Sequence, residues 1–191
     1  MKPPQIRTYF LLSVLFFAVW PSLIAQSSAL TPVSTDLLLT ADKTIAEATL
    51  ASADHQTLYA AVKAADLEKT LETSGPFTVF APSDRAFSRF STEELKNLFK
   101  SENRRKLKAL LTYHIVAGNL TASKILLAMC RGNGKAIFTT IQGNKITATM
   151  QGTDIILTDS LGNSAKIITA DSSLRNGVIH EIDSVILPSR I

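Results

Sequence analysis

The three histidines are the side chains of this chain best suited to bind a metal ion or to carry a proton. They stand far apart at His55, His114 and His180, and no His-x-His or His-x-x-x-His spacing places two of them on one face. The chain has no Gly-x-Ser-x-Gly turn for a serine nucleophile. A phosphate-binding loop precedes a helix, but no helix is predicted after the Gly-Asn-Gly run at 132–134. Unless the fold brings the histidines together, we expect no metal, no cofactor and no catalytic residue, and we do not predict an enzyme.

Cys130 is the only cysteine, so no disulfide can form within the chain. Arg131 is the only charged neighbour and no histidine adjoins the thiol, so the sequence does not indicate a catalytic cysteine. We expect Cys130 to be a small buried residue, with a reactive or cross-linking thiol as the alternative. Glu93 and Glu94 stand at a predicted helix start, where capping and the helix dipole account for them.

The N-terminal residues resemble an export signal. Lys2 and Arg7 precede an apolar run at residues 9–20, and small residues follow at Ala25 and Ala29. The run is shorter than the roughly 20 residues that span a bilayer. We therefore predict a signal peptide at 1–25, a Ser/Thr-rich linker at 26–42 and a folded domain at 43–189. The predicted location is secreted, periplasmic or at the cell surface, without stable membrane insertion after cleavage. A retained anchor is the alternative.

Composition and charge narrow the function further. Hydrophobic residues make up 46% of the chain and charged residues 19%, which fits one globular domain. The formal charge is +4, and loss of Lys2 and Arg7 with the leader leaves about +2. This excess is too small to indicate a nucleic-acid partner.

The elements that position these residues change character along the chain. Helical periodicity starts at Thr44, and Asp54 and Asp66 are predicted to cap the next two helices. Ser83 or Asp84 caps a helical turn, and further helices are predicted at 91–99, at about 102–112 and around residue 125. Short strands are predicted at 77–81, 113–116, 136–141, 145–150, 154–158, 165–169 and 178–187. Helices followed by strands indicate an α+β fold.

Three sequence segments, in a fixed order along the chain, are specific enough to suggest a protein family. They read GPFTVFAPSDRAF at 75–87, LTYHIVAG at 111–118 and NGVIHEIDSVILP at 176–188. In order and spacing they resemble the signature segments of fasciclin domains, and the resemblance covers about residues 44–188. It implies a wedge of two β layers with N-terminal and flanking helices. It also implies extracellular adhesion, protein or polysaccharide partners and no common catalytic centre. The run at 129–134 departs from the usual connection, so no contact of that loop is carried over.

Tyr113 and His114 have two interpretations. By the resemblance they are candidate partner contacts, because the corresponding pair in some fasciclin proteins takes part in integrin-mediated adhesion. By their residue types they are structural, with apolar bodies and polar tips that seek buried partners. The second interpretation is favoured. His180 alternates with Val178 and Ile182 and should face the same layer, bound to backbone or a carboxylate.

The sequence therefore predicts a secreted, non-catalytic module for adhesion or for binding an extracellular macromolecule. An exported binder of small ligands or glycans is the alternative, and a hydrolase is the third possibility. The identity of the partner and the oligomeric state are left open.

Overall fold

The computed structural model describes residues 42–189. The predicted signal peptide (1–25) and all but the last residue of the predicted linker (26–42) lie outside the described residues, as do residues 190 and 191. Within 42–189, no helix combines the length and the apolar character needed to cross a membrane. The boundaries of the predicted domain stay a prediction.

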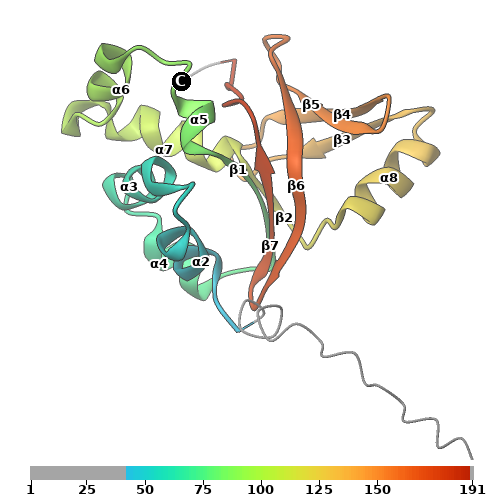
Figure 1. Cartoon of the computed structure of the whole chain (residues 1–191), viewed down its shortest axis with the longest axis horizontal. Coiled ribbons are helices and arrows are strands. Elements are labelled where there is room, and N and C mark those ends of the chain that lie inside the picture. Colours follow the sequence, from blue (N-terminus) through green and yellow to red (C-terminus); the bar gives the residue numbers. More distant parts are fainter. Residues whose placement is uncertain (1–41, 190–191) are drawn as a thin grey trace, which may run out of the picture. The chain divides into compact units, whose positions relative to one another are not determined.

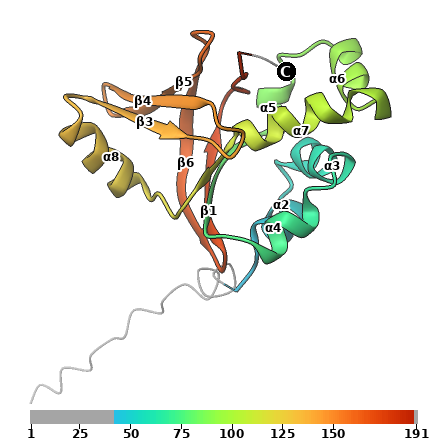
Figure 2. The same ribbon diagram turned by 180° about the vertical axis from the view of Figure 1, so that it is seen from behind.

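Helices form the first half of the described chain and one flank of the second. Figure 1 shows α2, α3, α4 and α7 on one side of the strands and α8 on the other, and the reverse view in Figure 2 agrees. Their bounds are α2 (Ile45–Ala51), α3 (Gln56–Ala64), α4 (Glu68–Thr73), α5 (Asp84–Phe87), α6 (Thr92–Leu98), the 3-10 helix η1 (Ser101–Asn103), α7 (Arg104–Tyr113) and α8 (Ala122–Arg131).

The strands form one seven-stranded sheet in the order β2-β1-β7-β6-β5-β4-β3. The pair β1–β7 is parallel, and every other pair is antiparallel. The predicted α+β fold class is confirmed. The bounds are β1 (Phe77–Pro82), β2 (Ile115–Ala117), β3 (Lys135–Thr139), β4 (Lys145–Gln151), β5 (Asp154–Thr158), β6 (Ser164–Leu174) and β7 (Gly177–Ile182).

The two predicted β layers are two halves of this single sheet. Strand β6 joins them, because residues 164–166 pair with β5 and residues 167–174 pair with β7. Two register shifts interrupt the pairing of β6 with β7 between residues 167 and 172. The outer strands also meet. Val116 bridges Thr140, and the N–H of Ile141 donates to the carbonyl of Ile115 at 2.8 Å.

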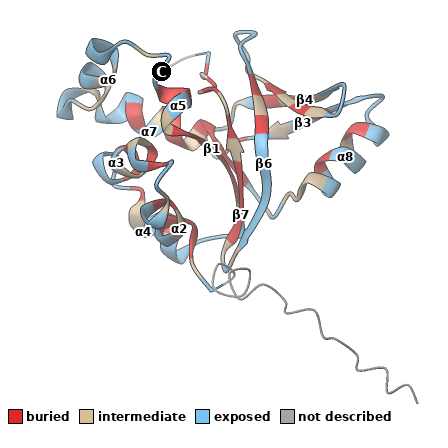
Figure 3. Cartoon of the chain, viewed as in Figure 1, coloured by how far each residue is buried: buried red, intermediate tan, exposed pale blue. Residues whose placement is uncertain are grey.

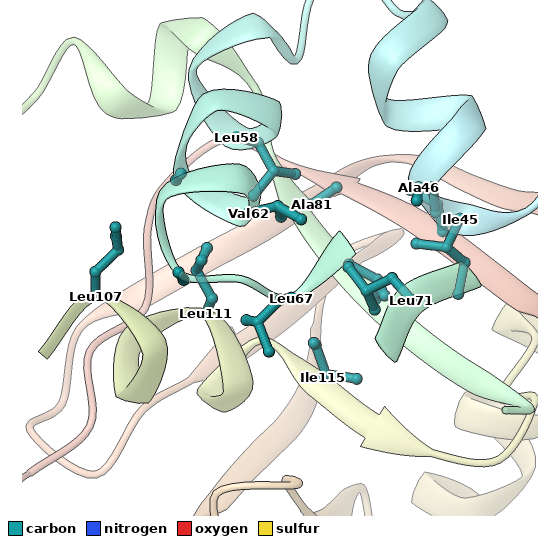
Figure 4. Close-up of a cluster of buried hydrophobic side chains, with 14 of the residues drawn as sticks. Ile45, Ala46, Leu58, Val62, Leu67, Leu71, Ala81, Leu107, Leu111 and Ile115 are labelled. Atoms are coloured by element: carbon teal, nitrogen blue, oxygen red, sulfur yellow. The ribbon is translucent and has the colours of Figure 1, made fainter. Parts of the chain in front are cut away.

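Two apolar clusters hold the layers together. The first lies between α2, α3, α4, α7 and one face of the sheet, where Leu107 and Leu111 of α7 point inward at i, i+4 spacing (Figure 4). The second lies between the halves of the sheet and α8, which contributes Ile125 and Met129 at the same spacing. Figure 3 shows β7 buried along most of its length, whereas the middle of β6 is exposed. Strand β7 is therefore the centre of the fold.

Helix capping differs from the prediction at two aspartates. Neither Asp54 nor Asp66 caps a helix, since α3 begins after His55 and α4 after Leu67, both without a side-chain cap. The carboxylate of Asp84 takes this role for α3 from another element. Its Oδ1 accepts the N–H of Thr57 at 2.7 Å, and its Oδ2 accepts that of Gln56 at 3.1 Å. Four other caps come from local side chains, namely Thr44, Ser83, Ser91 and Thr121.

The turn between β6 and β7 anchors the first helices. The side chain of Asn176 accepts the N–H of Ile45 at 2.9 Å and donates to the carbonyls of Leu71 and Ser74. Gly177 has φ 155°, and a Cβ there would overlap the carbonyl oxygen of Phe77 on β1. The position has no room for a β-carbon, because the parallel strands approach closely here.

Candidate functional site

Tyr113 and His114 lie at the end of α7, where a strand was predicted. Tyr113 is the last residue of α7 and His114 is its C-cap, so β2 begins two residues later than predicted, at Ile115. The helix continues because its buried face, formed by Leu107, Leu110 and Leu111, extends to the Tyr113 ring. Tyr113 is 0% exposed and His114 is 2% exposed.

The hydroxyl of Tyr113 connects three elements. It donates to the carbonyl of Lys145 on β4 at 2.9 Å and accepts the N–H of Ser160 between β5 and β6 at 3.3 Å. Burial raises the pKa of Tyr113, so the phenol stays protonated and able to donate. The side chain therefore works as an internal link between α7 and the second half of the sheet.

His114 makes a second internal link. Its Nδ1 lies 2.9 Å from the carbonyl of Leu110, and its Nε2 accepts the backbone N–H of Ile186 at 3.2 Å. Because that N–H can only donate, Nε2 is the acceptor and Nδ1 carries the proton. Burial lowers the pKa of His114 to about 4, so the ring is neutral at physiological pH. As a partner contact the Tyr113–His114 pair stays a prediction, and its burial means that binding would require the surface to open.

His180 also bonds to the backbone, as predicted. Its Nδ1 accepts the N–H of Asp171 at 3.2 Å, so Nε2 donates to the carbonyl of Leu120 at 2.7 Å. The ring stacks on Phe80 of β1 with centroids 5.7 Å apart. Burial lowers the pKa of His180. The ring thus ties the segment before α8 to the central strands and is not open to a substrate.

Ser52 and His55 form a serine–histidine hydrogen bond, at 2.7 Å between Oγ and Nδ1. A hydrolytic pair also needs a group that orients the second ring nitrogen and donors for an oxyanion. The Nε2 of His55 is buried without a hydrogen-bond partner in the described part of the chain. The carboxylate of Asp84 is occupied by the start of α3. The pair therefore fits a helix-entry turn better than a catalytic dyad.

Metal ligands do not gather in the described range. Among residues 42–189, no three His, Cys, Asp or Glu side chains are close enough to hold a metal ion. Cys130 is exposed on α8, which corrects the expectation of a buried residue. The reason is helical phase, because Ile125 and Met129 take the inward positions and Cys130 follows on the outer side.

A hollow with a mixed polar and apolar lining opens on the surface beside α5. Its larger part has a volume of about 390 Å³ and is lined by Arg85, Arg89, Ile168 and Asp183, together with Ser83 and Ser88. A smaller part of about 190 Å³ shares Arg89 and extends towards the turn before β6 and the segment after β7. The larger volume falls in the range of ligand-binding clefts, roughly 300–1,000 Å³.

Sequence reasoning assigned no role to the two arginines of this hollow. Arg85 belongs to the first signature segment, and Arg89 follows four residues later. Arg85 lies in α5 and Arg89 directly follows its C-cap, Ser88. The close spacing of the two cations is the signal that could have singled them out. The same hollow is lined by Ile168 of β6 and by Asp183, which directly follows β7, and no local pattern predicts that they meet the arginines.

Comparison with known proteins places the chain in a family. A model of the fasciclin domain matches residues 53–188. Protein sll1483 of Synechocystis sp. is 36% identical over 164 residues, which cover 85% of this chain and 81% of that protein. Immunogenic protein MPB70 of Mycobacterium bovis is 33% identical over 115 residues, covering 60% and 51%. Human periostin is 31% identical over 136 residues, covering 71% of this chain and 15% of periostin.

A solved structure agrees with the fold. The FAS1 domain pair from the insect cell adhesion molecule Fasciclin I matches with a TM-score of 0.68 at 18% identity, covering 77% of this chain and 51% of that one. The family model spans Tyr113, His114 and His180, and all three residues are buried here. The chain belongs to the fasciclin domain family.

Proposed function

We propose that the protein is an exported module that binds an extracellular protein or polysaccharide and turns over no substrate. The binding role is supported by the name of the structural match, a cell adhesion molecule. The absence of turnover is supported by the family, whose domains are generally non-catalytic. The predicted signal peptide at 1–25 supports a secreted, periplasmic or cell-surface location.

The distribution of polar groups carries the proposal. Three buried titratable side chains, Tyr113, His114 and His180, bond to backbone atoms inside the domain, and buried His55 bonds to the hydroxyl of Ser52. The exposed hollow beside α5 instead presents Arg85 and Arg89 to solvent. Chemistry would need perturbed groups that converge in a cleft, whereas binding needs an accessible surface with fixed polar groups. The exposed arginines of the hollow support a binding role.

The experiment is retention of the exported protein on immobilised extracellular proteins and polysaccharides, with its location checked by fractionation of the culture. We expect saturable retention on at least one polymer and no hydrolysis of ester, peptide or glycan substrates. Retention on none of them, or reproducible turnover, would overturn the proposal. A role as a binder of small ligands or glycans is the second candidate, and the volume and mixed lining of the hollow favour it.

A further inference from the structure

The hollow beside α5 presents two guanidinium groups without an anionic partner. Arg85 and Arg89 are both exposed, four residues apart and on adjoining parts of the hollow. Neither forms an ion pair in the described range, where the two ion pairs that occur involve other residues. An arginine that is not already paired can bind a carboxylate through two parallel hydrogen bonds. The two arginines of the hollow are therefore available to bind an anion.

The facing wall limits how much negative charge the ligand can carry. Asp183 lines the same hollow, and its Oδ1 accepts the N–H of Lys166 at 2.9 Å and the hydroxyl of Ser184 at 3.0 Å. Its Oδ2 has no hydrogen-bond partner among residues 42–189. A ligand rich in phosphate or sulfate would bring acceptors of like charge to this oxygen. A ligand with hydroxyl donors would satisfy it.

The remaining lining is partly apolar. The side chain of Ile168 is 47% exposed, and Phe90 and Val185 are half-buried in the smaller part. Ser164 and Asn163 add exposed polar groups at its rim. Sugar rings present hydroxyl groups at their edges and C–H groups on their faces, so they match a surface of this mixed character.

We infer that this hollow binds acidic sugar residues of a polysaccharide, with Arg85 and Arg89 on the carboxylates and Asp183 on the hydroxyl groups. The inference rests on the proposed function, which it makes specific by naming the ligand class and the surface. Ligand binding here needs no opening of the core, because the lining arginines already face solvent.

The test uses the full exported chain and oligogalacturonate as the probe, with titration calorimetry as the readout. Fully methyl-esterified oligogalacturonate is the matched ligand, since it keeps the sugar backbone and loses the charge. The double variant Arg85→Gln/Arg89→Gln removes the guanidiniums of the hollow. Its control is Arg105→Gln/Lys108→Gln, which removes the same charge from the exposed face of α7. Thermal unfolding checks that all variants fold.

We expect the unmodified oligogalacturonate to bind. Affinity should fall at least about tenfold in Arg85→Gln/Arg89→Gln, because charge-assisted hydrogen bonds are lost, and stay unchanged in the α7 control. The methyl ester should bind at least about tenfold more weakly than the acid. Equal affinity for the ester, an equal loss in the α7 control, or tighter Arg85/Arg89-dependent binding of polyphosphate or polyglutamate would each overturn the inference.

The experiments distinguish failure of this inference from failure of the proposed function. If the wild-type protein is retained on an extracellular protein or neutral polysaccharide and Arg85→Gln/Arg89→Gln does not weaken retention, the inference fails and the proposed function stands. If the wild-type protein is retained on no polymer and binds no oligogalacturonate, both fail.

Discussion

The imidazole of His114 accepts a hydrogen bond from the backbone N–H of Ile186 at 3.2 Å. Ile186 is fully buried and belongs to the segment after β7, so this bond fastens the C-terminal segment to the end of α7. The bond requires a neutral ring, because a protonated Nε2 would face the N–H with a hydrogen of its own. The attachment of the C-terminal segment therefore depends on pH.

The free energy of unfolding should fall as the pH drops from about 6.5 to 4. Burial lowers the pKa of folded His114 to about 4, from 6.5 for an ordinary histidine. Between these values the unfolded chain binds the proton and the folded chain does not, so acid favours unfolding. The stabilisation is complete above pH 6.5, and its loss reaches about 3 kcal/mol near pH 4. The lowered pKa of His180 acts in the same direction. Denaturant titrations at several pH values measure the slope.

His114→Gln isolates the contribution of this ring. The variant should be less stable at pH 7.5, and its stability should depend less on pH between 6.5 and 4 than that of the wild-type protein. Carboxylates that titrate in the same range affect both proteins alike, so the difference between the slopes belongs to His114. Identical slopes would show that protonation of this ring is not coupled to folding.

Tyr113→Phe should destabilise the domain by about 1–2 kcal/mol, because the carbonyl of Lys145 and the N–H of Ser160 lose their partner. Tyr59→Phe is the matched control. Its hydroxyl donates to Glu68 at a partly exposed site, so water can replace the bond and the loss should be smaller. Chemical denaturation of the three proteins measures both changes.

The same Tyr113 variant, together with His114→Ala, tests the pair as a partner contact. If the pair is structural, melting temperature falls and any loss of binding follows from unfolding. A loss of binding at unchanged melting temperature would instead establish a direct contact. Both quantities should come from the same preparations, with binding measured well below the melting temperature.

Asp84→Ala should cost about 1–2 kcal/mol, the usual range for a lost helix cap. Burial opposes ionisation of this carboxylate, but the hydrogen bonds from Thr57 and Gln56 outweigh it and lower the pKa of Asp84. Asp54→Ala is the control, because the Asp54 side chain caps no helix and only its carbonyl accepts a hydrogen bond, from the N–H of Asp84. Equal losses in urea titrations of the two variants would contradict capping of α3 by Asp84.

Gly177→Ala should destabilise the protein by at least about 2 kcal/mol, since the new methyl group meets the backbone of Phe77 and forces β1 and β7 apart. Gly143→Ala separates this collision from backbone strain. Gly143 has φ 94°, and a Cβ there has open space, so its cost should stay near 1 kcal/mol. The melting temperatures of the two variants provide the comparison, and equal decreases would exclude the collision as the cause.

Local patterns predicted much of the fold. Strand β5 matches its predicted bounds at 154–158, and Ser91 with Glu94 forms the predicted capping box. These features depend on residues within a few positions of one another. The same reasoning wrongly predicted that Asp54 caps α3. The actual cap is Asp84, which is 27 positions from its partner Thr57, and no local pattern reveals this contact.

The candidate site was less accessible to prediction. Tyr113 and His114 were chosen by resemblance, and their burial follows from contacts with β4 and the C-terminal segment, 32 and 72 positions away. The hollow beside α5 likewise joins Arg85 to Ile168 and Asp183 from the far end of the chain. Because three distant segments form this surface, no periodic pattern in the sequence predicts it.

The contact between β2 and β3 affects how the domain can associate with other chains. Exposed strand edges are templates for strand addition and aggregation, and here the two ends of the sheet meet at Val116 and Thr140. Beyond Lys166, β6 no longer pairs with β5, so this side of the strand is an open edge. Two register shifts and the left-handed backbone of Asp171, at φ 62°, make the edge irregular. An irregular edge resists the regular ladder that a neighbouring strand needs. The domain is therefore poorly suited to associate with other chains by extension of its sheet.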